Sequence, residues 1–397
     1  MGTDVDVRPY EIAVSAEEVD DLRERLARTR WPAELTDAWD RGTPVGYARR
    51  LAERWRTTFD WRAQEVRLNR LPQFVAEVDG QRIHGLHVRS TRADATPLLL
   101  CHGYPTSCVE FARLAPLLAE PDGDAPAFHV VAPSMPGYGL STPLASHGWD
   151  IVRTADAFDR VVRALGYERY AVFGGDVGAG VAEQLCLDAG DRVVASLVST
   201  DPGAIATAYT PPTDHLTPAE AERHQALVAA RTEDFGYLQV QATRPLSVAY
   251  GLTDSPAMQL TWIVEKFHEW TDPAHDLPEE AVDVDDLLAL VSVSWFGRAG
   301  DGAANLLYET AHSAAAWGRH HDRPQGMTAF GTEPLMRRIL DPDGMLPFWN
   351  ERPRGGHFPA MERPDDVAAD VRAFLGDPAL RESAATAAQG AAAPGAS

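Results

Sequence analysis

Aspartate stands at the centre of the stretch Gly174-Gly175-Asp176-Val177-Gly178, which has the form of a nucleophile elbow. The sharp turn of an elbow, between a strand and a helix, strains its central residue and needs small neighbours two positions away on either side. Most elbows carry serine. A carboxylate can instead displace a leaving group at saturated carbon and form an ester that water then cleaves. A glycine-rich turn with an incidental aspartate is the alternative, whereas the elbow interpretation predicts that Asp176 is a nucleophile.

Two further motifs would supply what hydrolysis of such an ester requires. The loop His102-Gly103-Tyr104-Pro105 follows an apolar stretch and can aim a backbone N–H group at the site, while Val177 offers a second N–H group. Together they would form an oxyanion hole for the tetrahedral species. His357, in Gly355-Gly356-His357-Phe358, lies late in the chain on a predicted loop. That is the usual place of the general base in hydrolases with a nucleophile elbow.

An alternation of strands and helices would position these motifs. Strands are predicted at 97–101, 128–132, 170–173, 194–198, 326–331 and 348–351, and helices at 109–118, 151–165, 178–189 and 364–375. Alternation of this kind indicates a parallel sheet with covering helices, so the predicted fold class is α/β with a mostly parallel central sheet.

Two regions depart from the alternation. Residues 205–323 have a mostly helical pattern, and a helical insertion in a parallel sheet indicates a cap over the site. The N-terminal region is predicted to be a meander with a capping box at Ser15 and Glu18, followed by a β-hairpin. The expected units are the meander and hairpin (1–90), the first part of the core (91–204), the cap (205–323), the second part of the core (324–380) and a disordered Ala/Gly/Ser-rich tail (381–397).

Composition excludes several classes of function. The chain has 397 residues and a net charge of −22, which disfavours binding to nucleic acid or to an anionic membrane. The three cysteines have no paired spacing and no zinc-site pattern occurs, so neither a disulfide framework nor a metal is expected. The sequence has no signal peptide and no apolar run of the roughly 18 residues that a spanning helix requires. We therefore expect a soluble, cytoplasmic protein.

Taken in order, the motifs resemble those of the α/β-hydrolase-fold epoxide hydrolases of the microsomal type, in their soluble bacterial form. The resemblance covers roughly residues 8–375. It rests on Arg8-Pro9-Tyr10 with Arg30-Trp31-Pro32, on His102-Gly103-Tyr104-Pro105, on Ser134-Met135-Pro136-Gly137-Tyr138-Gly139, on Gly175-Asp176 and on Gly355-Gly356-His357-Phe358. Each motif alone is weak evidence, but their occurrence together and in this order is highly specific.

The resemblance implies an epoxide as substrate and a vicinal diol as product, without cofactor or metal. Asp176 would attack an oxirane carbon while the family's two lid tyrosines, which fall on Tyr237 and Tyr308, protonate the ring oxygen. From the residues alone, both tyrosines would be assigned to the core of the cap. His357 would then deprotonate the water that attacks the ester, with the backbone N–H groups of Tyr104 and Val177 holding the oxyanion.

The chain departs from the family at the acid that orients the histidine. Similar enzymes show Phe-x-x-x-Pro-x-acid after the seventh core strand, and here the acid position holds Met336, whose thioether cannot orient a histidine. We predict that Glu333 replaces it, because Glu333 lies at the carboxyl end of that strand. The main alternative is Asp201, which follows the sixth strand. Asp341 and Asp343 are weaker candidates, because they lie further along a Pro/Gly segment that resembles a turn.

Two other functions stay open from the sequence. A haloalkane dehalogenase shares the aspartate nucleophile, but such enzymes hold the halide with a tryptophan where this chain has Val177. A non-hydrolytic binding or accessory protein is favoured by Met336.

The aromatic residues of the insertion indicate a bulky, apolar epoxide. Relatives of this type serve detoxification or natural-product assembly, including that of enediyne antibiotics. The sequence does not choose between these roles, and it allows a homodimer.

Overall fold

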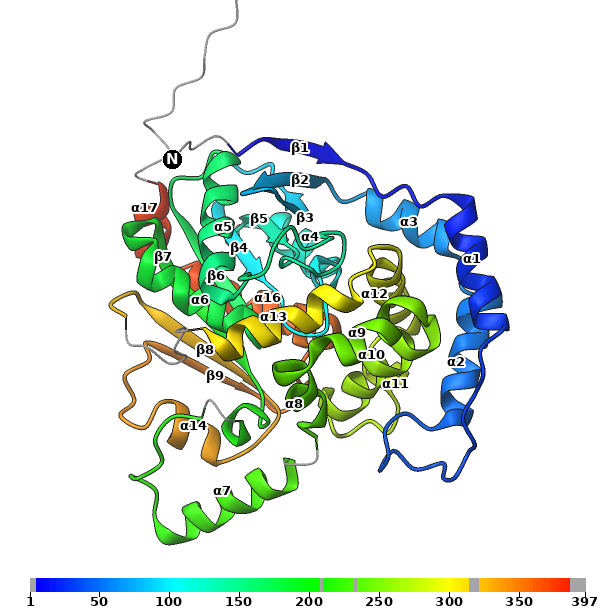
Figure 1. Cartoon of the computed structure of the whole chain (residues 1–397). Coiled ribbons are helices and arrows are strands. Elements are labelled where there is room, and N and C mark those ends of the chain that lie inside the picture. Colours follow the sequence, from blue (N-terminus) through cyan, green and yellow to red (C-terminus); the bar gives the residue numbers. More distant parts are fainter. Residues whose placement is uncertain (1–4, 208–209, 232–233, 314–320, 386–397) are drawn as a thin grey trace, which may run out of the picture.

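The computed structural model describes residues 5–207, 210–231, 234–313 and 321–385. These residues form a nine-stranded sheet with helices around it (Figure 1). Its strand order is β1-β2-β3-β5-β4-β6-β7-β8-β9. The strands are β1 (Val7–Tyr10), β2 (Gln73–Val78), β3 (Gln81–Val88), β4 (Thr96–Cys101), β5 (Phe128–Pro133), β6 (Tyr170–Gly175), β7 (Val193–Thr200), β8 (Gln325–Phe330) and β9 (Phe348–Arg352). The pairs β1·β2, β2·β3 and β3·β5 are antiparallel, and the remaining pairs are parallel.

The central strands are continuous apolar runs because helices cover both faces of the sheet. Successive side chains of a strand point to opposite faces. In β4, accordingly, Leu99 and Cys101 belong to one core cluster and Leu98 and Leu100 to another. The first cluster includes residues of α5 (Ile151–Ala164) and α6 (Val177–Asp188), and the second includes residues of α4 (Leu114–Ala119) and α16 (Pro364–Leu375). The predicted α/β class with a mostly parallel sheet is confirmed.

Seven α-helices lie between β7 and β8 in the described ranges and form the helical insertion (Figure 1). They are α7 (Pro218–Arg231), α8 (Gly236–Thr243), α9 (Pro245–Asp254), α10 (Pro256–Trp270), α11 (Pro278–Ala281), α12 (Val284–Phe296) and α13 (Gly300–His312). The N-terminal helices α1 (Ala16–Ala27), α2 (Val45–Thr57) and α3 (Trp61–Asn69) pack against α10 and α12. The Trp55 indole N–H donates to the Ser292 hydroxyl (2.8 Å), so the meander is fastened to the cap.

Shorter elements complete the fold. They are the 3-10 helices η1 (Cys108–Phe111), η2 (Gly190–Arg192) and η3 (Ala204–Ala206), and the helices α14 (Leu335–Leu340), α15 (Pro359–Glu362) and α17 (Pro378–Ala385). Within the described ranges, no helix is long and apolar enough to cross a membrane.

Three local predictions need correction. The helix predicted at 109–118 is divided into η1 and α4. The arm at 7–10 adds an edge strand to β2, which the sequence pattern did not indicate. The tail predicted to be disordered from residue 381 begins inside α17, where Ala384 is buried and the Arg169 guanidinium donates to the Ser383 hydroxyl (2.7 Å). The rest of that tail, 386–397, lies outside the described residues.

Candidate active site

Asp176 occupies the turn between β6 and α6 with φ 52° and ψ −129°, a backbone conformation that is strained for a residue with a side chain. The glycines around it are required by contact. A Cβ atom on Gly174 would lie 2.3 Å from the Gly178 carbonyl oxygen, and one on Gly178 would lie 2.1 Å from the Cys101 carbonyl oxygen. The elbow therefore presses its helix against the end of β4, and the carboxylate projects from the carboxyl edge of the sheet.

The loop after β4 lies directly against this carboxylate. A Cβ atom on Gly103 would lie 2.4 Å from the Asp176 Cβ, so only glycine allows the loop to approach so closely. The Tyr104 backbone N–H donates to Asp176 Oδ1 (2.8 Å), and the nearby Val177 backbone N–H also helps to lower the pKa of the carboxylate. These are the two donors that the sequence indicates for an oxyanion hole, and they converge on one oxygen-bearing group.

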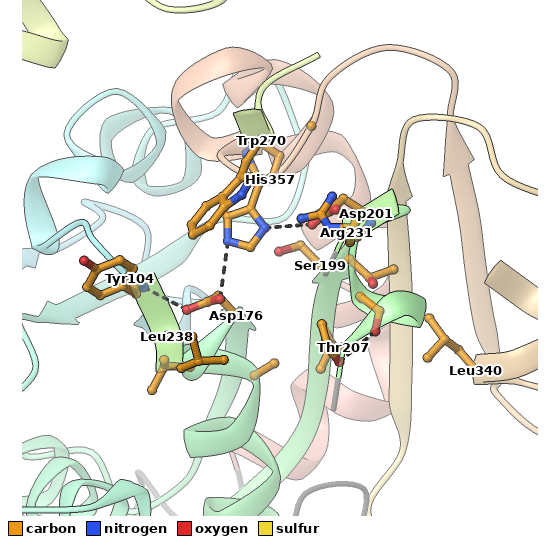
Figure 2. Close-up of a pocket in the computed structure, with 18 of the residues that line it drawn as sticks. Tyr104, Asp176, Ser199, Asp201, Thr207, Arg231, Leu238, Trp270, Leu340 and His357 are labelled. Atoms are coloured by element: carbon orange, nitrogen blue, oxygen red, sulfur yellow. Dashed lines mark hydrogen bonds and ion pairs between the residues drawn. The ribbon is translucent and has the colours of Figure 1, made fainter. Parts of the chain in front are cut away.

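His357 lies between two carboxylates, as Figure 2 shows. Its Nε2 is 3.4 Å from Asp176 Oδ2, and its Nδ1 is 2.7 Å from Asp201 Oδ2. The His357 backbone N–H donates to the Trp270 carbonyl oxygen (2.7 Å), and the two rings lie 4.9 Å apart. A histidine held at both ring nitrogens and at its backbone has one defined orientation, with Nε2 directed toward the nucleophile.

The acid beside His357 is Asp201, and the prediction of Glu333 is wrong. Glu333 accepts a bidentate ion pair from Arg223 of α7 (2.9 Å to each oxygen) and the backbone N–H of Leu335 (3.1 Å). It thus joins the cap to the start of α14. Asp201 directly follows β7, the neighbour of the nucleophile strand β6, and this proximity brings its carboxylate to the histidine.

Met336, at the acid position of similar enzymes, has a packing role. It is buried in a small apolar cluster with Ile205, Leu335 and Ile339. The site has a carboxylate from another strand, so Met336 no longer favours a protein that has lost its acid.

Mutual charges fix the protonation of the site. Burial would lower the pKa of His357, but the carboxylates of Asp201 and Asp176 outweigh burial and raise it to about 10. Burial would likewise raise the pKa of Asp176, but the bond to His357 and the backbone N–H groups hold it below its usual range. The pKa of Asp201 is also lowered against burial, by His357 and then by Arg231. The resting site therefore holds an imidazolium between two carboxylates.

A cavity of about 260 Å³ opens above these groups. Its lining is mostly apolar, and the residues drawn from the cap include Phe235, Tyr237, Leu238, Trp270 and Leu307. The ring of Tyr237 stacks on that of Tyr104, with centroids 5.4 Å apart. Burial first, and then the negative charge of Asp176, raise the pKa of the Tyr237 phenol well above its usual value. Tyr237 therefore stays protonated and can donate.

Tyr308 stands apart from the other predicted site residues. Its neighbours Leu307 and Thr310 line the cavity, whereas the Tyr308 ring stacks on His312 of the same helix, at 4.2 Å between centroids, and is outside the lining. The structure thus brings together Asp176, His357, Tyr237 and both oxyanion donors, but not Tyr308.

Comparisons with known proteins bear on the activity. Residues 7–111 match the family described as epoxide hydrolase N terminus, and residues 96–245 match the alpha/beta hydrolase fold. A protein of Stigmatella aurantiaca whose name places it among the epoxide hydrolases is 37% identical over 383 residues, or 92% of this chain and 84% of the relative. The chain belongs to the epoxide hydrolase family. This membership decides against the haloalkane dehalogenase alternative.

Solved epoxide hydrolases share the fold over nearly the whole chain. The Aspergillus niger epoxide hydrolase has a TM-score of 0.79 at 29% identity, covering 94% of this chain and 96% of the other. The juvenile hormone epoxide hydrolase of the silkworm Bombyx mori has a TM-score of 0.80 at 26% identity, covering 96% and 95%. The enzyme is a hydrolase that acts on the ether bond of an epoxide.

Proposed function

We propose that this epoxide hydrolase opens its substrate through a covalent ester on Asp176. The observation that carries the proposal is the arrangement of three side chains at the floor of an apolar cavity. Asp176 Oδ2 is 3.4 Å from His357 Nε2, and His357 Nδ1 is 2.7 Å from Asp201 Oδ2. A strained, ionised carboxylate beside an oriented histidine suits nucleophilic attack followed by attack of water.

In the first step, Asp176 Oδ2 attacks one oxirane carbon and the C–O bond of the ring breaks. The electron pair of that bond passes to the ring oxygen, which takes the phenolic proton of Tyr237. Tyr308 is proposed as a second donor to this oxygen. It would have to leave its stack on His312 and turn toward the face that Leu307 and Thr310 give to the cavity.

The second step uses a change of charge. Esterification removes the negative charge of Asp176, which helps to hold the pKa of His357 high in the free enzyme. The pKa of the imidazole therefore falls once the ester forms, and the imidazolium releases its Nε2 proton, which by way of solvent restores the phenol of Tyr237. Nε2 can then accept a proton. Water gives that proton to His357 and attacks the ester carbonyl, while the N–H groups of Tyr104 and Val177 stabilise the oxyanion. Cleavage of the ester releases the diol.

The cavity supports a bulky, apolar epoxide as substrate. Its largest apolar side chains, which include Phe235, Leu238, Trp270 and Leu340, can surround a hydrocarbon group, while polar groups gather near Asp176. Burial of apolar substrate surface contributes roughly 25 cal/mol per Å², so the apolar part supplies affinity and the polar end supplies orientation.

Isotope labelling tests the ester. One turnover of styrene oxide in ¹⁸O-water should leave the label in the carboxyl group of Asp176, because water attacks the enzyme's own carbonyl carbon. In His357→Gln, the protein mass should rise by that of one substrate molecule and stay raised. Label in the diol alone after the first turnover would exclude the ester mechanism.

A further inference from the structure

A second, much smaller cavity adjoins the nucleophile. Its volume is about 10 Å³, the size that accommodates one water molecule. Asp176 and His357 both line it, together with the side chain of Glu110. Most of the other lining residues are apolar, among them Phe111, Phe173 and Phe358. A water molecule there would lie beside both reacting groups of the second step.

Glu110 is a buried carboxyl group that the mechanism above does not use. It belongs to η1 and is 8% exposed. The Thr106 hydroxyl lies 2.5 Å from Glu110 Oε2, and within the described ranges the Glu110 carboxyl has no other hydrogen bond and no ion pair. Burial raises its pKa to about 7, against the hydrogen bond from Thr106. Since burying a carboxyl group without a charged partner costs free energy, its place beside the reacting groups suggests a role in the chemistry.

The hydrogen bonds around Thr106 leave one oxygen of Glu110 available. His102 Nε2 accepts the Met135 backbone N–H (2.9 Å), so the imidazole proton lies on Nδ1 and is donated to the Gly103 carbonyl oxygen (2.9 Å). The Thr106 hydroxyl lies near both that carbonyl (3.0 Å) and Glu110 Oε2 (2.5 Å). Whether Glu110 Oε2 accepts a hydrogen bond from the Thr106 hydroxyl or donates one to it, Glu110 Oε1 keeps free lone pairs.

We propose that Glu110 is a positioning residue for the water that hydrolyses the Asp176 ester, and this inference rests on the proposed function. In the free enzyme, His357 Nε2 faces Asp176 Oδ2 at 3.4 Å, and within the described part of the chain it has no other partner. In the ester form, one O–H group of the water donates a hydrogen bond to His357 Nε2 and the other donates to Glu110 Oε1. Held by both protons, the water oxygen directs a lone pair at Cγ of Asp176.

The step balances without a change at Glu110. The water oxygen bonds to Cγ of Asp176, one water proton passes to His357 Nε2, and the carbonyl electrons move to the oxygen held by Tyr104 and Val177. The bond between Cγ and the substrate oxygen then breaks, and that oxygen takes the proton from His357. The new carboxyl group of Asp176 keeps the second water proton and passes it to His357, which restores the carboxylate and the imidazolium. Glu110 ends the cycle with the protons that it had at the start.

Two substitutions at Glu110 separate this role from packing. Glu110→Gln keeps an acceptor oxygen and a polar partner for Thr106, whereas Glu110→Leu removes both. Formation and breakdown of the ester are followed separately with styrene oxide, by tryptophan fluorescence in a single turnover. We expect ester formation to stay within about twofold in both variants. Breakdown should slow about 10²-fold in Glu110→Leu, the cost of a misplaced reactant, and less than tenfold in Glu110→Gln.

A matched control is Glu65→Leu. Glu65 is 9% exposed, close to the exposure of Glu110, and lies on α3 outside both cavities. This variant should leave both rates unchanged. Equal slowing of formation and breakdown in Glu110→Leu would overturn the inference, and so would equal breakdown rates in the Gln and Leu variants. Failure of His357→Gln to trap any ester would instead refute the proposed function.

Discussion

In the proposed mechanism, the carboxylate of Asp201 sets the tautomer of the His357 imidazole. With an ionised acid 2.7 Å from Nδ1, that nitrogen keeps its proton and Nε2 is free to act on water. Asp201→Asn can leave the ring in the wrong tautomer and removes a charge that stabilises the imidazolium. We expect ester breakdown to slow by roughly 10³- to 10⁴-fold, with a smaller change in ester formation. Single-turnover kinetics measures both steps, and Glu333→Gln is the control that should leave breakdown unaffected.

The pH dependence should differ between the two steps. Ester formation needs the Asp176 carboxylate, whose pKa lies below its usual 3.8, so its rate should hold until the pH falls below about 4. Breakdown needs neutral His357 and should rise with pH. Its midpoint should lie below the pKa of about 10 in the free enzyme, because the ester has lost the Asp176 charge. Rapid-mixing kinetics gives the midpoint of the pH dependence of ester breakdown, and NMR titration gives the pKa of His357 in the free enzyme for comparison. Coincident values would contradict the charge argument.

The two cap tyrosines should contribute unequally to ring opening. Tyr237 already lines the cavity, so Tyr237→Phe should slow ester formation by about 10²-fold. Tyr308→Phe should slow it less, because Tyr308 must give up its stack on His312 to reach the ring oxygen. The double variant should nearly abolish formation while substrate still binds. An unaltered rate in the double variant would assign both rings to packing of the cap.

At the scale of elements, the sequence predicts those features that depend only on neighbouring residues, such as the elbow and the strands. The elbow can be predicted because only glycine fits at Gly174 and Gly178, where an added Cβ atom would lie 2.1–2.3 Å from a backbone oxygen. The strands around it are apolar runs of recognisable length. The acid was not predictable in the same way. β7 and β8 are neighbours that end at the same edge of the sheet, so Asp201 and Glu333 satisfy the same local criterion. The choice depends on a partner far along the chain, Arg223, which draws Glu333 toward the cap.

Tyr308 illustrates the same limit within one helix. Leu307 and Thr310 are three residues apart and share the face of α13 that meets the cavity. Tyr308 lies one position round from Leu307 and meets His312, four positions on. The sequence motif fixes the helix but not the rotation that decides which side chains reach the substrate.

The elbow also predicts how tightly α6 is held. In Gly178→Ala, the new methyl group would collide with backbone atoms of Cys101 and His102 at 2.1–2.6 Å, and neither can move away as a side chain could. Overpacking of this kind costs about 1–3 kcal/mol, so the free energy of unfolding should fall by at least this amount, along with activity. Gly236→Ala is the matched control, since a Cβ atom there meets nothing within 4 Å. Urea unfolding measures both variants, and equal stabilities would show that the elbow can relax.

At the scale of the whole molecule, the cap is held from two sides. On one side, Arg223 of α7 and Glu333 form an ion pair that joins the cap to the second part of the core. On the other, the N-terminal helices pack against α10 and α12, with Tyr47 donating to Glu279 (2.6 Å) and Arg54 paired with Asp285 (2.8 Å). The meander therefore acts as a support for the cap, although it lies more than 200 residues away in sequence.

The buried end of this support is the bond from Trp55 to Ser292, and it yields a test of the whole arrangement. Trp55 is 3% exposed, and its indole N–H donates to a hydroxyl that is itself fully buried. Trp55→Phe keeps an aromatic ring but leaves Ser292 without this donor, at a cost of about 1–3 kcal/mol. Amide hydrogen exchange should become faster in α10 and α12 while β4 to β7 keep their protection, because local opening draws on the least stable unit. KM should rise more than ester breakdown slows. Trp31→Phe is the control, since Trp31 is only half-buried. Uniformly faster exchange across cap and sheet would mean that the meander stabilises the molecule as one unit and does not hold the cap in particular.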